Sequence, residues 1–248
     1  MRGLGTILNV VAILVGSAVG IAFGNRLPER TARTVTDGLG LVTLVIGGLN
    51  VVALRDPAFV ETVGGGVTLL VVLGALLIGG IVGSALRIEA RLEAFGGVLQ
   101  RRFAPEGAEH LSRARFVEGF VDASLIFTIG PLAILGAISD GLGLGIDQLA
   151  LKATLDGFAS LAFAASLGWG VAASALPVGV WQGAVTIAAI LVGASLSTSA
   201  VAALTATGGV LLLGVGLRIL DVRAVPVGDL LPALIVAPLL TQLVAAIR

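Results

Sequence analysis

The strongest constraint on this chain is a series of continuous apolar runs, each about twenty residues long, separated by short polar or charged stretches. An α-helix needs a run of this length to cross about 30 Å of hydrocarbon. Membrane β-strands alternate apolar and polar residues over roughly ten positions, which these runs do not do. The pattern therefore predicts an all-α, polytopic transmembrane helix bundle.

Composition points to the same class, since 57% of the 248 residues are hydrophobic and 12% are charged. Soluble domains carry about 25% charged residues. Fifteen basic and fifteen acidic residues cancel, which gives no field for binding a nucleic acid. The chain has no Cys and one His, which disfavours thiolate metal sites and Cys- or His-based nucleophile systems. We expect no metal, no cofactor and no enzymatic activity, with a two-acid mechanism left open.

The apolar runs predict about eight spans. They cover residues 4–24, 35–54, 67–86, 116–139, 147–168, 171–196, 200–220 and 227–247. With eight crossings, the loops after the first, third and seventh spans share one side and hold eleven of the fifteen basic residues. The positive-inside rule then puts these loops in the cytoplasm and both termini outside. Whether residues 147–196 cross twice in full stays open.

We treat residues 1–248 as one membrane domain with four segments. These are an N-terminal three-helix segment (1–86), a cytoplasmic connector (87–115), a central segment with acidic residues and broken helices (116–196), and C-terminal helices (197–248). In the connector, apolar residues recur at helical spacing between charged ones, from Ile88 to Phe103. This is typical of an amphipathic helix on the membrane surface. A solvated connector packed on the bundle is the alternative.

Two internal similarities predict inverted repeats. The sequence AILVG occurs at residues 12–16 and again at 189–193. The acid-Gly-Phe motif that begins at Glu118 is echoed by the one that begins at Asp156. In each case the two copies would run through the membrane in opposite directions. Many secondary transporters are built from repeats of this kind around a site at the midplane.

Ionisable residues inside the spans are candidate functional residues, because each costs at least about 2.5 kcal/mol at a helix centre. Glu118 and Asp122 lie four residues apart on one helix face, and so do Lys152 and Asp156 with opposite charges. Asp122 and Asp156 are predicted to share one cavity. In the alternatives, Glu118 caps a helix start and Asp156 only neutralises Lys152. The sequence assigns Asp140 to an outer loop.

Prolines and amides supply further candidates for an ion or substrate site. Gly130 and Pro131 fall within the fourth predicted span and Pro177 within the sixth, where a break would expose backbone groups to a ligand. Plain kinks are the alternative. Asn9, Asn50 and Gln182 can line the same path or form interhelical hydrogen bonds.

Glycines at four-residue spacing predict close helix packing. They are Gly16, Gly20 and Gly24 in the first span, and Gly79 and Gly83 in the third. Small residues let helix backbones approach where lipid provides no hydrophobic drive to association. The contact can form within one protomer or between protomers, so a homo-oligomer is possible.

Several motifs taken together resemble the bacterial membrane family called domain of unknown function 554 (DUF554). They are the segments 118–120, 123–125, 130–136, 155–158 and 174–177, the pair 182–183, and Gly5, Asn9, Gly16, Gly20 and Gly24 at the start. The resemblance extends over essentially the whole chain. It implies an uncharacterised protein of the bacterial cytoplasmic (inner) membrane and adds no substrate.

The leading functional hypothesis is a small secondary transporter in the inner membrane. Its partners would be the lipid bilayer and an unknown ion or small solute, and the excess of acidic over basic residues in the spans favours a proton, a cation or a zwitterion. A passive channel formed by oligomerisation is one alternative. A membrane sensor or scaffold that transports nothing is another.

Overall fold

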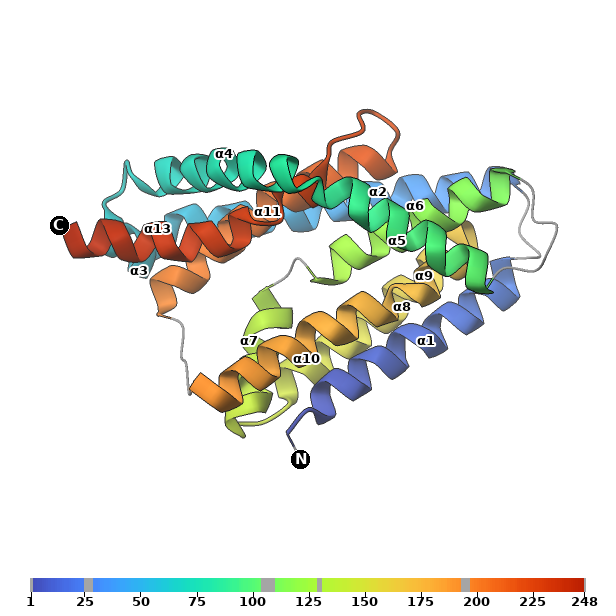
Figure 1. Ribbon diagram of the computed structural model, residues 1–248, viewed down its shortest axis with the longest axis horizontal. Helices are drawn as coiled ribbons and strands as arrows, with labels where there is room; N and C mark the ends of the chain where they lie inside the picture. The colour runs from blue at the N-terminus through green and yellow to red at the C-terminus, as the bar shows by residue number, and fades with distance from the viewer. Residues whose placement is uncertain (1, 25–28, 104–109, 129–130, 193–196, 248) are drawn as a thin grey trace. The chain divides into compact units, whose positions relative to one another are not determined.

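The computed structural model describes residues 2–24, 29–103, 110–128, 131–192 and 197–247, and the regular elements in these ranges are all helices (Figure 1). In chain order they are α1 (Leu4–Gly24), α2 (Glu29–Val51), η1 (Val52–Arg55), α3 (Pro57–Val63), α4 (Thr68–Leu86), α5 (Ile88–Phe103), α6 (His110–Thr128), α7 (Pro131–Leu142), α8 (Asp147–Leu167), α9 (Trp169–Ala173), α10 (Ala175–Val192), α11 (Thr198–Ile219), α12 (Val227–Leu230) and α13 (Ala233–Ile247). The all-helical fold class is confirmed for this part of the chain.

Fewer than eight helical segments within the described ranges pass as membrane spans by length and apolar character, so the predicted count of about eight is not confirmed. Five helical segments within the described ranges pass both criteria: Leu4–Phe23, Thr68–Leu86, Trp169–Leu191, Thr198–Ile219 and Val227–Ile247. Two bent pairs raise the count to seven if each is one span: Gly40–Arg55 with Pro57–Val63, at 49°, and Ala114–Thr128 with Leu132–Leu142, at 76°. The remaining predicted segment is α8, which does not pass. It is 21 residues long, but its charged side chains lower its hydropathy.

The helices form two compact units that are interleaved along the chain. Unit 1 contains Met1–Leu39 and Leu92–Ser195, and unit 2 contains Gly40–Arg91 and Leu196–Arg248. Both α2 and α5 contribute residues to each unit. Residues far apart in the sequence therefore share a core in either unit.

Unit 1 is organised around α1 and α8, which pack at backbone contact. A Cβ atom at Gly16 would lie 2.1 Å from the carbonyl oxygen of Gly157, and one at Gly20 would lie 2.2 Å from that of Leu161. Near the start of α1, Gly5 lies against the side chain of Leu149. Residue numbers rise together on both helices, so α1 and α8 run parallel. This is the relative direction that eight crossings predict for the first and fifth spans.

The helix α7 joins the start of α1 to α10. The two carboxylate oxygens of Asp140 accept hydrogen bonds from the backbone N–H groups of Gly3 and Gly5, each at 3.0 Å. These N–H groups have no partner within α1, because a helix leaves its first four donors unsatisfied. The next residue, Gly141, faces the carbonyl oxygen of Thr186 on α10. Asp140 is thus a buried helix residue, and its assignment to an outer loop is wrong.

Unit 2 is built around α11, which carries fifteen buried residues. The α2 segment in this unit packs on α11, where Gly47 and Gly209 meet at backbone distance. On α4, Gly79 lies against the backbone of Ala233, and Gly83 lies against the carbonyl group of Asp229. Both of these predicted packing glycines therefore contact the α12–α13 segment. The sequence prediction for Gly24 concerns the last residue of α1, for which no contact is described.

The segment predicted to be amphipathic forms α5, and polar contacts fix its first turn in unit 2. Glu89 forms an ion pair with Arg218, the basic residue in the last turn of α11. The backbone N–H of Glu89 donates to the carboxylate of Asp229 at 2.9 Å. Within unit 1, Phe95 of α5 packs against Phe120 of α6, with ring centroids 6.0 Å apart.

We predict that Gly16→Ala destabilises the protein by about 1–3 kcal/mol, the usual effect of overpacking a tight contact. The added methyl group would meet the Gly157 carbonyl, and backbone cannot move aside as a side chain can. The free energy of unfolding in detergent measures the change. The matched control is Gly183→Ala on α10, where a Cβ atom meets nothing within 4 Å. Equal stability of the two variants would contradict the tight α1–α8 contact.

Candidate functional site

The centre of unit 1 contains an ion pair between Lys152 and Asp156 on α8. The Lys152 ammonium nitrogen lies 2.5 Å from Asp156 Oδ2, and the two side chains are 7% and 10% exposed. Residues four apart on a helix lie on one face, one turn above the other, so the backbone of α8 sets this pairing. The pair is therefore local in sequence but fully inside the unit.

Two buried amides extend the pair onto other helices. The side-chain nitrogen of Asn9 on α1 donates to Gln182 Oε1 on α10 at 3.3 Å, and both residues are 0% exposed. The Asn9 side chain also lies beside the Asp156 carboxylate and interacts with it. We call Asn9, Lys152, Asp156 and Gln182 the polar centre. It connects α1, α8 and α10, which Figure 1 shows side by side in blue, yellow and orange.

Apolar groups surround the polar centre. The Lys152 ammonium lies 6.0 Å from the centroid of the Phe127 ring on α6, and that ring packs edge to face against Phe163 on α8. An aromatic face attracts a cation at this distance, which adds a second favourable contact for Lys152. Charges in such surroundings interact strongly, yet removing them from water carries a large desolvation cost. The pair therefore depends on both partners.

Several buried polar atoms near the polar centre have no hydrogen-bond partner within the described ranges. They are Asn9 Oδ1, Gln182 Nε2, and the hydroxyl oxygens of Thr6 and Thr186. Most buried polar groups in proteins are hydrogen-bonded, and exceptions commonly mark a bound water, an ion or a functional role. The polar centre thus has free donors and acceptors beside its ion pair.

The two acids on α6 lie in different surroundings. Asp122 is 1% exposed, whereas Glu118 is exposed. A Cβ atom at Gly119 would lie 3.0 Å from the Leu167 side chain, which places this part of α6 beside the end of α8. Asp156 lies eleven residues before Leu167 on α8, and Asp122 lies three residues after Gly119 on α6, toward Asp156. The remaining offset of about eight residues, at a rise of about 1.5 Å each, puts Asp122 and Asp156 about 12 Å apart along the α8 axis. This register separates the two carboxylates that were predicted to share one cavity.

The predicted helix breaks have different outcomes. Gly130 lies outside the described residues, α6 ends at Thr128, and α7 begins at Pro131. Pro177 lies in the first turn of α10, where the missing N–H of proline is tolerated best. The segment Trp169–Leu191 forms one apolar helical stretch through that proline. Pro177 therefore does not produce a sharp bend.

Asn50 belongs to the other unit and is not part of the polar centre. It lies on α2, where its Cβ atom would be 2.9 Å from a Cβ atom built at Gly209 on α11. Within the described residues, no group of three or more His, Asp or Glu side chains is placed to hold a metal ion.

Thr6 and Thr186, one helical turn from the polar centre, were missed as candidates, and so was Asp140 at the start of α1. Threonine is common in membrane helices, so a single Thr carries no signal. A signal did exist in the spacing, because Thr6 precedes Asn9 by three residues and Thr186 follows Gln182 by four. Each pair lies on one helix face.

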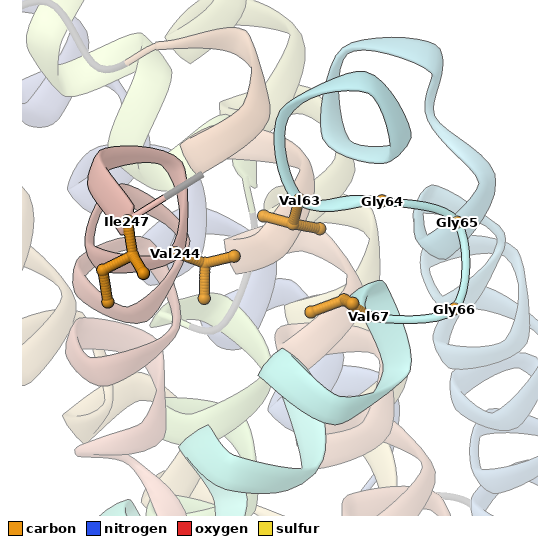
Figure 2. Close-up of a pocket in the computed structure, with 7 residues that line it drawn as sticks. All are labelled: Val63, Gly64, Gly65, Gly66, Val67, Val244 and Ile247. Carbon is orange, nitrogen blue, oxygen red and sulfur yellow. The ribbon is translucent and has the colours of Figure 1, made fainter.

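A hollow of about 520 Å³ lies at one end of unit 2 (Figure 2). The glycines at 64–66, which connect α3 to α4, form one wall, and Val63, Val67, Val244 and Ile247 form the rest. Gly64 has φ +94°, a left-handed conformation that suits glycine in this turn. The lining carries no ionisable or hydrogen-bonding side chain, so the hollow offers no chemistry for an ion.

Comparisons with known proteins place the chain among uncharacterised membrane proteins. The family model described as "Protein of unknown function (DUF554)" matches residues 4–242. The chain is 29% identical to the "Uncharacterized membrane protein YdfK" of Bacillus subtilis (strain 168), covering 98% of this chain and 97% of that protein. It is 31% identical to the "Uncharacterized protein YqgA" of Escherichia coli (strain K12), covering 94% of each chain. No solved structure matches the chain.

We predict that Lys152→Met lowers the free energy of unfolding by about 3–5 kcal/mol, because it leaves a buried carboxylate without its cation. Asp156→Asn should also destabilise the protein by stranding the ammonium. The double variant removes both charges and should recover most of the loss. Thermal unfolding in detergent measures all three, with Asp147→Asn as a control at the exposed start of α8. Additive losses in the double variant would show that the two side chains do not depend on each other.

Proposed function

The chain belongs to the DUF554 family of proteins of unknown function, and we propose that it is a secondary transporter that moves a proton or a small cation through unit 1. The charged element of the pathway is the Lys152–Asp156 pair. The observation that carries the proposal is the burial of this pair and of two amides where α1, α8 and α10 meet.

The membrane makes a buried charge costly. Ionisable residues within membrane helices are rare and mostly serve ion pathways, proton relays or ligand counter-ions. A packing role alone is served at lower cost by apolar side chains, since a buried ion pair is often no more stable than a hydrophobic replacement. The pair, its amides and their free hydrogen-bonding atoms therefore support a transport site more than a structural one.

The chemistry of exchange follows from the pair itself. A proton that binds the Asp156 carboxylate removes its negative charge and weakens its hold on the Lys152 ammonium. If Lys152 then loses a proton on the other side, the pair becomes a neutral acid and a neutral amine. Transfer of the proton from the acid to the amine restores the original ion pair, and one proton has crossed the site. A small cation would act differently, by taking the place of the Lys152 ammonium beside Asp156.

The end of α6 and the start of α7 also support a transport site at the Lys152–Asp156 pair. Phe127, in the last turn of α6, contacts Lys152. Gly136 of α7 lies against Leu149 of α8, and a four-residue connection joins these two helices as an antiparallel pair. The first turn of α7 is therefore level with Lys152 and Asp156. Helix ends at the depth of a charged pair are a recurring feature of transporter binding sites.

We predict that liposomes containing the protein take up protons when a pH gradient and a K⁺-valinomycin potential are imposed, as reported by an internal pH-sensitive dye. Asp156→Asn should lower this flux to that of protein-free liposomes, because the exchanging carboxylate is lost. The stabilised double variant Lys152→Met with Asp156→Asn should be equally inactive.

The double variant separates the transport role from a structural one. It keeps the protein folded while it removes the charged pair, so loss of flux cannot be attributed to unfolding. Asp147→Asn on the same helix removes one negative charge, as the single variant Asp156→Asn does, and should keep the wild-type flux. Full proton flux through the double variant would show that the pair is a structural counter-ion arrangement and that the transport site lies elsewhere.

A further inference from the structure

We infer that the interface between α1 and α10 holds a short file of water molecules, which leads from the face of unit 1 where α1 begins to the Lys152–Asp156 pair. This inference deepens the proposed function and rests on it for its biological role. The geometry that carries it is the stacking of buried, unpartnered hydroxyl and amide groups at successive levels of the two helices.

The levels follow from the packing of α1, α7 and α10. Asn9 contacts Gln182 at one level. Closer to the start of α1, Asp140 binds Gly3 and Gly5, and its neighbour Gly141 lies against Thr186. Thus Thr186 is level with the first turn of α1, while Gln182 is level with Asn9. The two helices therefore run antiparallel.

Two polar layers result from this arrangement. The first contains Asn9, which lies beside Asp156, and its partner Gln182. The second lies one helical turn closer to the start of α1 and contains Thr6, three residues before Asn9, and Thr186, four residues after Gln182. Residues at these spacings share a helix face, so both layers point into the same interface. The spacing between layers is about 5 Å, the pitch of an α-helix and a distance that one water molecule can bridge.

The burial of these groups indicates water as the ligand. Thr6 is 9% exposed, Thr186 is 3% exposed, and both amides are 0% exposed. Within the described part of the chain, Thr6 Oγ1, Thr186 Oγ1, Asn9 Oδ1 and Gln182 Nε2 have no hydrogen-bond partner. A buried water typically makes about three hydrogen bonds to polar groups of this kind. The four atoms offer both donors and acceptors, which matches the amphoteric chemistry of water better than that of an anion.

The carboxylate of Asp140 defines the outer limit of the file. It is 2% exposed and is held by two backbone N–H groups at the first turn of α1. A hydrated path from this end would let a proton reach Asp156 from one membrane face only. The sequence predicts that this face is the outside, since the basic loops follow the ends of the first, third and seventh spans.

Single cysteines test the file directly, because the chain contains no native Cys. We would introduce Thr6→Cys and Thr186→Cys separately and expose sealed vesicles to silver ions, which are small and react with thiols. The thiol that remains after quenching and unfolding is measured by mass spectrometry. The matched controls are Ile13→Cys on α1 and Ala189→Cys on α10, which are buried at apolar positions of the same helices.

We expect Thr6→Cys and Thr186→Cys to react about tenfold faster than the controls, which become reachable only through local opening of the helices. The reaction should occur when silver is added at the face where α1 begins, and not from the opposite face. Reaction no faster than the controls would overturn the inference, and so would equal reaction from both faces. The labelling does not depend on flux, so the two proposals are tested separately. The cysteines can fail to react while Asp156→Asn still abolishes transport. They can also react as expected while Asp156→Asn leaves transport unchanged.

Discussion

The close contact between α1 and α8 is the feature on which the rest of unit 1 depends. Glycines at two successive turns of α1 bring its backbone against that of α8, and no larger residue fits at either position. The contact sets the register that places Asn9 beside Asp156 and, through Asn9, positions Gln182 of α10. In lipid, where apolar surface gains little from association, such backbone packing is a principal source of specific helix pairing.

The polar centre combines two opposing requirements. An ion pair in apolar surroundings is strong once formed, but each partner becomes costly if the other leaves. A site with this property has discrete states, because a half-open pair is unfavourable unless a proton, a cation or water compensates the exposed charge. Asn9 and Gln182, which contact each other in the polar centre, each keep one hydrogen-bonding atom without a partner in the described residues, and such atoms can take part in this compensation. The proposed transport role rests on this property of the pair.

Much of the helical architecture could be predicted from the sequence, because span length and apolar character are local properties. The Lys152–Asp156 pair is also local, since a spacing of four residues on a helix sets it. The contact between Asn9 and Gln182 could not be predicted in the same way, because 173 residues separate them. Only the packing of the helices brings them together. For the same reason the sequence could not separate Asn50 from the other two amides, although Asn50 lies in unit 2.

Asp140 shows a second way in which prediction from the sequence failed. The sequence assigned it to an outer loop, yet α7 continues to Leu142, and the carboxylate binds the N–H groups at the start of α1. A carboxylate at a helix N-terminus is a familiar arrangement, but here the helix and the carboxylate are more than 130 residues apart. The sequence also placed Asp122 and Asp156 together by motif similarity, whereas the register of α6 on α8 depends on Gly119 and Leu167.

The central claim is that the Lys152–Asp156 pair opens when Asp156 takes up a proton. Infrared difference spectroscopy of the reconstituted protein tests it most directly, by comparing spectra recorded before and after a pH jump. The account predicts a reversible C=O stretching band of a protonated carboxylic acid that is absent from Asp156→Asn and retained in Asp147→Asn. A spectrum in which Asp156→Asn leaves every carboxylic acid band unchanged would contradict the account, because the Asp156 carboxylate would then remain ionised in its pair.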